Sequence, residues 1–304
     1  MSPPPPSWRI RGGANYRSVS RKKVNPRRAL AEWLALADAI EATGAVINVV
    51  PYPRDVPEPL TGLMYTANAG WLRAPNRFRV ARLTVAHRQA EREYLSGLFS
   101  ALFGWQIEES RALWEGQADM CRLSDAMVLL SYGVRSTQES VDEVASLLPP
   151  GQDYRSVQLR EPFFHGDTCM NVLAGSTPLF LVLPSAFAAQ SEYQKVHDAA
   201  SAVGEIVEIT EADALAYACN SLGLGDEILI PTGLSEGLRF KLSERGYRLR
   251  QLDFTELFGK GGGGPRCLVN DLGSSTPPPT ASRYGELREA LHAMLEDYPT
   301  AEPS

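Results

Sequence analysis

Cys267 stands near the end of the chain, in sequence that could place a reacting nucleophile. It follows four glycines at residues 261–264 and precedes the apolar pair Leu268 and Val269. Glycines remove side chains where another molecule must come close to the backbone, and the apolar pair predicts a strand over residues 267–269 that would hold the sulfur at its mouth. A cysteine in apolar sequence is also typical of a small core residue. Its partners elsewhere in the chain decide between these interpretations.

Three other short segments place polar residues inside otherwise apolar sequence. They are residues 64–70 (MYTANAG), 114–119 (WEGQAD) and 163–169 (FFHGDTC). Taken singly, His165 could be a core histidine and Glu115 a surface carboxylate. Taken together with Cys267 and Asp167, they offer a nucleophile, a proton shuttle and a clamp for a cation. The combination predicts an active site.

Alternating strands and helices must position these residues. Apolar runs predict strands at residues 45–50, 126–130, 179–183, 205–209, 228–230 and 267–269. Amphipathic stretches predict helices at residues 86–103, 140–148 and 235–245, and Asn25 is expected to cap a helix over residues 26–43. Cys121, Cys169, Cys219 and Cys267 recur about every fifty residues, the length of a small β/α module, although chance could also produce three such intervals. The pattern predicts an α/β fold of repeated units.

Ser136 and Glu139 have the form of a capping box at the start of a helix. They place Arg135 at a junction between strand and helix, where α/β folds place their ligands. We divide the chain into a polar N-terminal segment (1–24), an α/β domain (25–273) and a C-terminal part (274–304).

The C-terminal part begins with a Ser/Thr/Pro linker over residues 274–282, followed by an amphipathic helix over residues 283–298. The apolar face of this helix carries Leu287, Leu291, Leu295 and Tyr298. It is expected to dock on the body of the protein or on a partner.

The composition is that of an ordinary globular chain, and we expect no metal site and no cofactor. Its 304 residues carry a net charge of −6, and 44% are hydrophobic, enough for one large core or two small ones. The acidic balance argues against nucleic acid, and the basic cluster over residues 9–28 is interpreted as a solvated surface segment. Four cysteines without zinc spacing predict reduced thiols. Without a membrane span or a signal sequence, we expect a cytoplasmic protein and leave a homo-oligomer open.

The motifs resemble those of one enzyme superfamily. The order Glu-Gly-x-x-Asp (115–119), His-x-Asp-Thr (165–168) and a glycine run ending in Cys267 is similar to the penteins. These guanidine-modifying enzymes include arginine deiminases, dimethylarginine dimethylaminohydrolases, amidinotransferases and arginine dihydrolases. The resemblance covers residues 48–270 and implies an α/β-propeller of about five β/α modules, with the active site in its central channel.

The resemblance also implies roles. Cys267 would attack the guanidinium carbon of a small-molecule substrate, while His165 would protonate the departing amine and then activate water. Asp167 would grip the guanidinium nitrogens, Glu115 would bind the guanidinium or orient His165, and Asp119 would belong to the same substrate-binding set. Planar guanidinium requires such a clamp because carboxylates match its fork of donors.

Two arginines are expected to hold the substrate α-carboxylate. They are Arg88, in His-Arg-Gln-Ala-Glu, and Arg135, in Tyr-Gly-Val-Arg-Ser-Thr. The alternative for each is a solvated surface charge.

Asn68 departs from most of the superfamily, which carries a carboxylate in this segment. Thr-Ala-Asn-Ala-Gly instead resembles the arginine dihydrolases, which convert arginine to ornithine with release of ammonia and carbon dioxide. An asparagine amide can donate to the oxygen of a neutral ureido intermediate and retain it for a second attack, whereas aspartate would repel it. Alternatively, Asn68 merely supports a turn before Gly70.

The N-terminal segment matches the dihydrolases less well. In this segment the arginine dihydrolases carry a His-Tyr-x-Val stretch and then Asn-Pro-Trp-Met. This chain instead has GGANY at residues 12–16 and NPRR at residues 25–28. The leading hypothesis is therefore a hydrolase of arginine or a substituted arginine that forms ornithine or citrulline. An amidinotransferase that uses an amine acceptor, and a non-catalytic binding protein, remain as alternatives.

Overall fold

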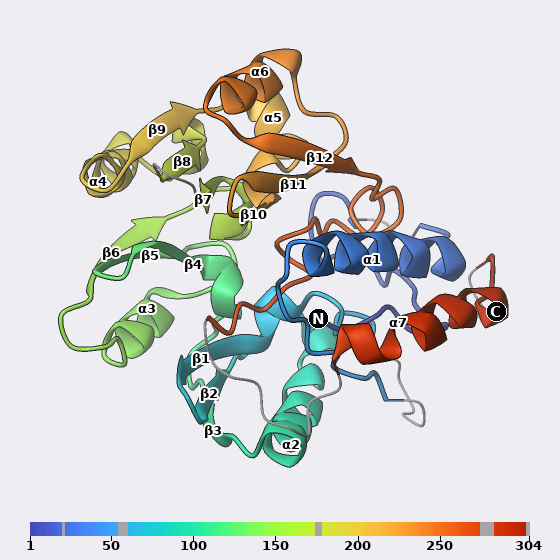
Figure 1. Cartoon of the computed structure of the whole chain (residues 1–304). Coiled ribbons are helices and arrows are strands. Elements are labelled where there is room, and N and C mark those ends of the chain that lie inside the picture. Colours follow the sequence, from blue (N-terminus) through green and yellow to red (C-terminus); the bar gives the residue numbers. More distant parts are fainter. Residues whose placement is uncertain (20–21, 54–59, 174–177, 274–282, 302–304) are drawn as a thin grey trace.

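The computed structural model describes residues 1–19, 22–53, 60–173, 178–273 and 283–301. Within these residues, twelve strands form four three-stranded sheets placed around a common centre (Figure 1). In each sheet the first and second strands pair antiparallel, and the second and third pair parallel. A parallel pair needs a crossover, and in every module a helix supplies it. The predicted fold of repeated β/α units is confirmed.

The four modules follow one another along the chain. The first contains η1 (Thr66–Ala69), β1 (Gly70–Ala74), β2 (Arg77–Val80), η2 (Ala86–Arg88), α2 (Glu91–Phe103) and β3 (Gln106–Glu109). The second contains η3 (Gly116–Asp119), β4 (Met120–Ser124), β5 (Met127–Tyr132), α3 (Gln138–Ala145) and β6 (Asp153–Gln158). The third contains η4 (Gly166–Thr168), β7 (Met170–Leu173), β8 (Leu179–Val182), η5 (Pro184–Ala186), α4 (Gln190–Ser201) and β9 (Glu205–Glu208). The fourth contains α5 (Glu211–Leu215), η6 (Ala218–Asn220), β10 (Leu222–Leu224), β11 (Glu227–Pro231), α6 (Glu236–Glu244) and β12 (Arg248–Leu252).

The short 3-10 helices η1, η3, η4 and η6 contact one another in that order near the centre. Gly116 permits the close approach of η3 to η1, because its φ is +69° and a Cβ there would lie 2.6 Å from the Ala67 carbonyl oxygen. Cys121, Cys169 and Cys219 each lie within such a 3-10 helix or just after it. The fifty-residue spacing of the cysteines thus follows the repeat of the modules.

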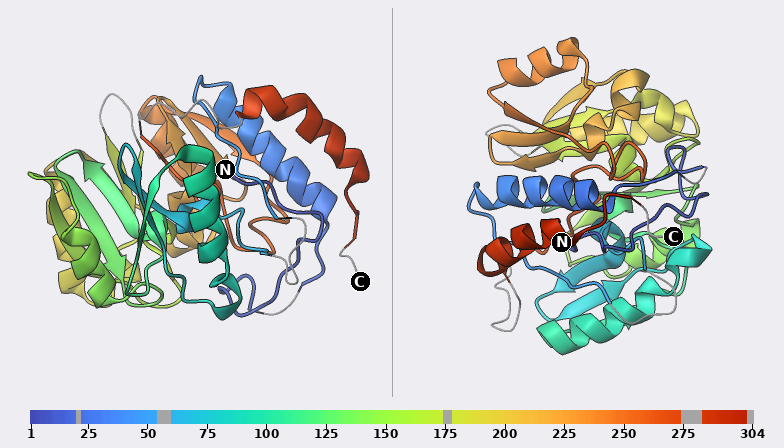
Figure 2. Two further views of the ribbon diagram at one scale, coloured as in Figure 1. Left: turned by 90° about the horizontal axis from the view of Figure 1, so that it is seen from below. Right: turned by 90° about the vertical axis from the view of Figure 1, so that its right-hand side faces the viewer.

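A helical sector completes the ring. It contains α1 (Pro26–Glu41), α7 (Tyr284–Ala293) and η7 (Met294–Asp297), and α1 lies beside α7 (Figures 1 and 2). Among the described residues this sector has no sheet, and it holds the isolated bridge between Asn48 and Arg283. The predicted strand at residues 45–50 is wrong, because Ile47 and Val49 pack into the core beside α1 instead of joining a ladder.

Both helices of this sector are anchored by polar contacts. Asn25 caps α1 as predicted, its side chain accepting from the Arg28 N–H at 2.9 Å. In α7, Leu291 is buried and the Tyr284 hydroxyl donates to Asp38 of α1 at 2.8 Å, so the C-terminal helix docks on the body. The predicted linker at residues 274–282 lies outside the described residues.

Three local predictions differ from the structure. The helix predicted at residues 86–103 is broken between η2 and α2. Ser136 forms no capping box, because Thr137 is the N-cap of α3 and the Ser136 hydroxyl donates to Asp119 instead. The N-terminal segment is not simply solvated, since Trp8 and Ile10 are buried in the core against α1.

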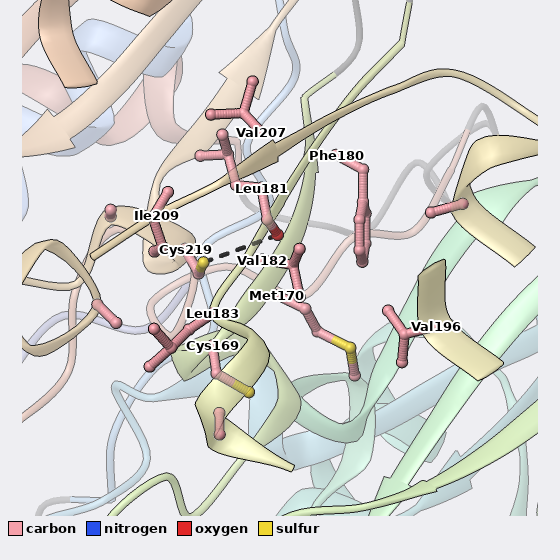
Figure 3. Close-up of a cluster of buried hydrophobic side chains, with 14 of the residues drawn as sticks. Cys169, Met170, Phe180, Leu181, Val182, Leu183, Val196, Val207, Ile209 and Cys219 are labelled. Carbon is pink, nitrogen blue, oxygen red and sulfur yellow. Dashed lines mark hydrogen bonds between the residues drawn. The ribbon is translucent and has the colours of Figure 1, made fainter. Parts of the chain in front are cut away.

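The largest apolar cluster joins residues of the second, third and fourth modules. Figure 3 shows Cys169 and Cys219 within it, among side chains such as Phe180 and Val182. No helix of the described residues is long and apolar enough to cross a membrane.

Candidate active site

Residues 266–270 form a turn at the centre of the ring, which we call the nucleophile turn. It is not the predicted strand, because its hydrogen bonds go to several modules instead of one ladder. Ala67 N and Thr66 Oγ1 of η1 donate to the carbonyls of Cys267 and Leu268, at 3.1 and 2.8 Å. From the fourth module, Asn220 O accepts from the Arg266 N–H at 2.9 Å. The fold therefore holds the cysteine by contacts from opposite sides of the channel.

The glycines before this turn serve the packing of the chain itself. A Cβ at Gly262 would lie 2.4 Å from the Asn15 side chain, and one at Gly263 would lie 2.1 Å from the Tyr65 ring. The Asn15 amide also donates to Gly261 O at 3.0 Å. The four glycines were expected to let another molecule come close to the backbone. In the structure, Asn15 and Tyr65 of the same chain lie close to it instead.

The Cys267 sulfur is buried between a donor and an acceptor. Asn220 Nδ2 donates to Sγ at 3.1 Å, and Asp167 Oδ2 lies 3.6 Å from Sγ. Burial and the charge of Asp167 raise the pKa of the Cys267 thiol, against the effect of the Asn220 hydrogen bond. Burial and Asp167 therefore disfavour the thiolate form of this sulfur.

His165 and Glu115 form a buried pair beside this sulfur. His165 Nε2 lies 3.1 Å from Glu115 Oε2, and Glu115 Oε1 accepts from the Thr84 backbone N–H at 2.8 Å. Burial favours a higher pKa for Glu115, but the His165 hydrogen bond and charge, with the nearby arginines, lower it to about 2. Burial lowers the pKa of His165, yet Glu115 and the neighbouring aspartates outweigh burial and raise it. Glu115 thus holds His165 in place and favours its protonated form.

Two buried polar atoms at this point have no hydrogen-bond partner in the described part of the chain. They are His165 Nδ1 and Asp167 Oδ1. Burial raises the pKa of Asp167 to about 6, although the charges of His165 and Arg266 oppose it. An unpartnered imidazole nitrogen and carboxylate oxygen beside a thiol can accommodate a polar ligand.

Asn68 lies where the sequence predicts it, and its amide is oriented from two sides. Its Nδ2 donates to Glu115 O at 3.0 Å, and its Oδ1 accepts from Arg88 Nη1 at 2.9 Å. Arg88 also donates to Glu91 and to Gly62 O. These bonds leave Arg88 one guanidinium hydrogen without a partner among the described residues, too few for a two-pronged grip on a carboxylate.

Arg135 is less constrained than Arg88. Its Nη1 lies 3.6 Å from Glu115 Oε1, and its guanidinium lies 5.4 Å from the centre of the Phe164 ring. Both arginines line the same cavity.

Asp119 departs from its predicted role as a substrate ligand. Its carboxylate accepts from Ser131 Oγ at 2.6 Å, from Ser136 Oγ at 2.5 Å and from Gly166 N at 3.0 Å. Ser136 Oγ in turn accepts from the Glu115 N–H at 3.0 Å. Asp119 therefore positions Ser131, Ser136 and Gly166, and hydrogen bonds within the protein occupy its carboxylate oxygens.

The cavity above Cys267 has a volume of about 60 Å³. His165, Asn68 and Arg135 line it, and residues 8–12 of the N-terminal segment line its opposite side. The basic segment expected at the surface is thus part of the pocket wall. Among the described residues, no group of His, Cys, Asp and Glu side chains could hold a metal ion.

Asn220 is the main residue that sequence reasoning missed. It is fully buried and contacts both the sulfur and the backbone of Cys267. A signal for it exists in the repeat, because Asn220 is the third residue of η6, as Asn68 is the third residue of η1.

Comparisons with known proteins identify the family of this chain. The family model of eukaryotic N,N-dimethylarginine dimethylhydrolases matches residues 15–273. The bifunctional arginine dihydrolase/ornithine cyclodeaminase ArgZ of Synechocystis sp. is 31% identical over 252 residues, covering 81% of this chain and 34% of that protein. This chain therefore spans about a third of the length of that relative.

Solved structures show the same fold. The N-terminal domain of ArgZ bound to product aligns with 91% of this chain and 98% of that chain, at 25% identity and a TM-score of 0.79. A variant of that domain, covalently bound to a reaction intermediate, aligns with 88% of this chain and 94% of that chain, at 26% identity and a TM-score of 0.77. The chain has the pentein fold and belongs to the N,N-dimethylarginine dimethylhydrolase family of guanidine-modifying enzymes.

Proposed function

We propose that this chain hydrolyses the guanidino group of arginine, or of a substituted arginine, through a covalent intermediate on Cys267. With arginine as substrate, the product is ornithine. One observation carries the proposal: Cys267, His165 and Asn68 line one cavity. Glu115 contacts His165 and Asp167 contacts the Cys267 sulfur next to it. The ArgZ domain structures, with a covalent intermediate and with product, support the same chemistry.

The first hydrolysis forms and breaks one bond to sulfur. As the substrate binds, the Cys267 thiol releases its proton to solvent. The thiolate sulfur attacks the guanidinium carbon, and the bond from that carbon to a terminal nitrogen breaks as the protonated His165 gives that nitrogen its proton. Ammonia leaves and an amidino-thioester remains. Water then attacks this carbon, His165 takes its proton, and the sulfur leaves as a thiolate.

Asp167 and Glu115 supply the electrostatics of this step. A guanidinium bound at the unpartnered Asp167 Oδ1 brings its positive charge next to the sulfur. That charge lowers the pKa of the Cys267 thiol and so helps to generate the thiolate. Glu115 keeps His165 protonated for the departing amine.

Asn68 determines whether a second round follows. Its Nδ2 keeps one hydrogen besides the bond to Glu115 O, and this hydrogen can hold the oxygen of the ureido intermediate. A second attack by Cys267 then expels the second ammonia, and hydrolysis leaves a carbamate that breaks down to carbon dioxide and ornithine. Arg88 orients the Asn68 amide, and Arg135 is the anchor for the substrate α-carboxylate.

Product analysis tests the proposal. The protein is incubated with arginine or N,N-dimethylarginine, with and without glycine as an amine acceptor, and products are identified by mass spectrometry. We expect ornithine and ammonia from arginine and no new guanidino compound with glycine. Transfer to glycine would instead establish an amidinotransferase. Citrulline without ornithine would contradict the role of Asn68, and no consumption of any guanidine would contradict the proposal itself.

A trapping experiment identifies the nucleophile. After brief exposure to substrate and an acid quench, intact mass spectrometry should show an adduct on the wild-type protein. Cys267→Ala should show none. An adduct that persists in this variant would remove Cys267 from the reaction.

A further inference from the structure

One donor and one acceptor lie at the Cys267 sulfur. Asn220 Nδ2 lies 3.1 Å from Sγ and donates to it. On its other side Asp167 Oδ2, at 3.6 Å, can accept the thiol proton. Donors stabilise a thiolate, whereas a carboxylate disfavours it. The hydrogen bond from Asn220 therefore suits the charged form of the sulfur.

The Asn220 amide fits its surroundings in one orientation. Its Oδ1 accepts from the Cys267 backbone N–H at 3.1 Å. Its Nδ2 then faces Sγ and the Asp167 carbonyl, which lies 3.2 Å away. If the amide were reversed, its oxygen would face the Asp167 carbonyl and its N–H group would face the Cys267 N–H. Neither pair can form a hydrogen bond, and Asn220 has no exposure to water that could replace one. The backbone of the nucleophile thus selects which end of the amide faces the sulfur.

We propose that Asn220 is a positioning residue that stabilises the thiolate form of Cys267 relative to the thiol and aims the sulfur for attack. The inference rests on the proposed role of Cys267 as nucleophile and is independent of which guanidine reacts. The Asn220 amide donates to the sulfur at the two stages when the sulfur is negatively charged. These are before the sulfur attacks and again when it leaves the hydrolysed carbon. Because the same amide also bonds the Cys267 N–H, it holds the turn and the sulfur as one unit.

Gly264 gives an independent way to move this amide. A Cβ at Gly264 would lie 2.8 Å from Asn220 Oδ1, closer than such contacts allow. Gly264→Ala therefore displaces the amide while leaving Asn220 in the chain. In the double variant, Asn220→Ala removes the clashing oxygen, so the added methyl has room.

The test measures thiolate formation without any substrate. The alkylation rate of Cys267 by iodoacetamide is followed across a pH series by mass spectrometry of its peptide, and the pH midpoint of each profile is compared. Asp167, the His165–Glu115 pair and the tyrosines at positions 16, 65 and 217 are titratable groups around this sulfur, and all are kept in every variant. The plateau at high pH reports access to the sulfur, so the midpoint is independent of accessibility.

We expect Asn220→Ala to raise the midpoint by about one pH unit, a roughly tenfold lower thiolate fraction at neutral pH. Gly264→Ala should shift it in the same direction, and the double variant should shift it no further than Asn220→Ala alone. Asn171→Ala is the matched control, because Asn171 donates to the neighbouring Ser221 O at 2.8 Å without contacting Cys267. Its midpoint should be that of the wild type.

Unchanged midpoints in Asn220→Ala and Gly264→Ala, whatever happens to their melting temperatures, would overturn the inference. If Asn220→Ala does not fold, Gly264→Ala with the control decides alone. Guanidine turnover by the wild type is scored separately. A shifted midpoint without turnover would support this inference and contradict the proposed function. Turnover with unshifted midpoints would support the proposed function and overturn this inference.

Discussion

The largest apolar cluster and the central channel both bury cysteines, but their surroundings differ. In the core, Cys169 Sγ lies 3.5 Å from Gly166 O and Cys219 Sγ lies 3.8 Å from Leu181 O (Figure 3). Both sulfurs are donors to carbonyls among apolar side chains, and burial raises the pKa of each thiol. Cys267 is also buried, with a raised thiol pKa, yet it accepts from Asn220 and adjoins Asp167.

Because burial raises the thiol pKa of all three cysteines, burial does not distinguish Cys267 from the core cysteines. What distinguishes it, and supports the proposed role as nucleophile, is the set of polar groups around it, including the unpartnered His165 Nδ1 and Asp167 Oδ1. A cation that binds there can offset the desolvation that keeps the thiol protonated. The core sulfurs have no such compensating group close by among the described residues.

The largest expected effect comes from removing the central sulfur. Cys267→Ala should reduce guanidine turnover by at least about a thousandfold, because no other group can form the covalent intermediate. Steady-state assays of ammonia release measure this loss. Turnover within about tenfold of the wild type would break the comparison, since Cys267 would then be as dispensable as the core cysteines.

The second effect concerns the charge beside His165. Glu115→Gln should lower kcat by about a hundredfold, because the general acid loses its partner. Glu115 raises the pKa of His165, so the protonated acid of the wild type persists until the pH rises past that raised value. Without the carboxylate, the pKa falls and the alkaline loss of kcat should begin at lower pH. A pH–rate profile with an unmoved alkaline arm would contradict this account.

A smaller change in chemistry is expected at Asn68. Asn68→Asp should shift the product from ornithine toward citrulline by about tenfold, because a carboxylate repels both the ureido oxygen and Glu115 O. The ion pair with Arg88 would keep the side chain in place. Product ratios at equal substrate consumption, with Asn171→Asp as control, measure the effect. An unchanged ratio would show that Asn68 only supports the turn.

The smallest effect on catalysis is expected in the apolar core. Cys169→Ala should lower the free energy of unfolding by about 1 to 2 kcal/mol through lost packing. Its kcat should stay within about twofold of the wild type. Denaturant unfolding and ammonia release measure the two quantities. A large loss of kcat at unchanged stability would mean that this core sulfur takes part in the chemistry.

Local sequence predicted some elements well and others poorly. The strand β8 was predictable because its four residues are all apolar and buried, and α1 because Asn25 and Pro26 begin it. The inner strands β1, β4, β7 and β10 were not predicted, since they are short and carry partly exposed residues. The apolar pair after Cys267 resembled a strand, but contacts from several modules hold it in a turn.

The sequence alone determined which chemistry is available. The types of Glu115, His165 and Cys267 indicated a clamp for a cation, an acid and a nucleophile. Guanidine chemistry, and the departure at Asn68, followed from the family resemblance that their order carries. Such properties belong to single residues and short motifs.

Only the tertiary structure decided which neighbours each group has. It joined Asn220 to Cys267 across 47 residues, turned Asp119 toward two serines and Gly166, and committed Arg88 to Glu91 and Asn68. Hydrogen bonds and desolvation depend on distances of a few ångströms between segments far apart in the chain, and local sequence does not specify those distances. The closing of the modules into a ring therefore determines which of the four cysteines has the surroundings of a nucleophile.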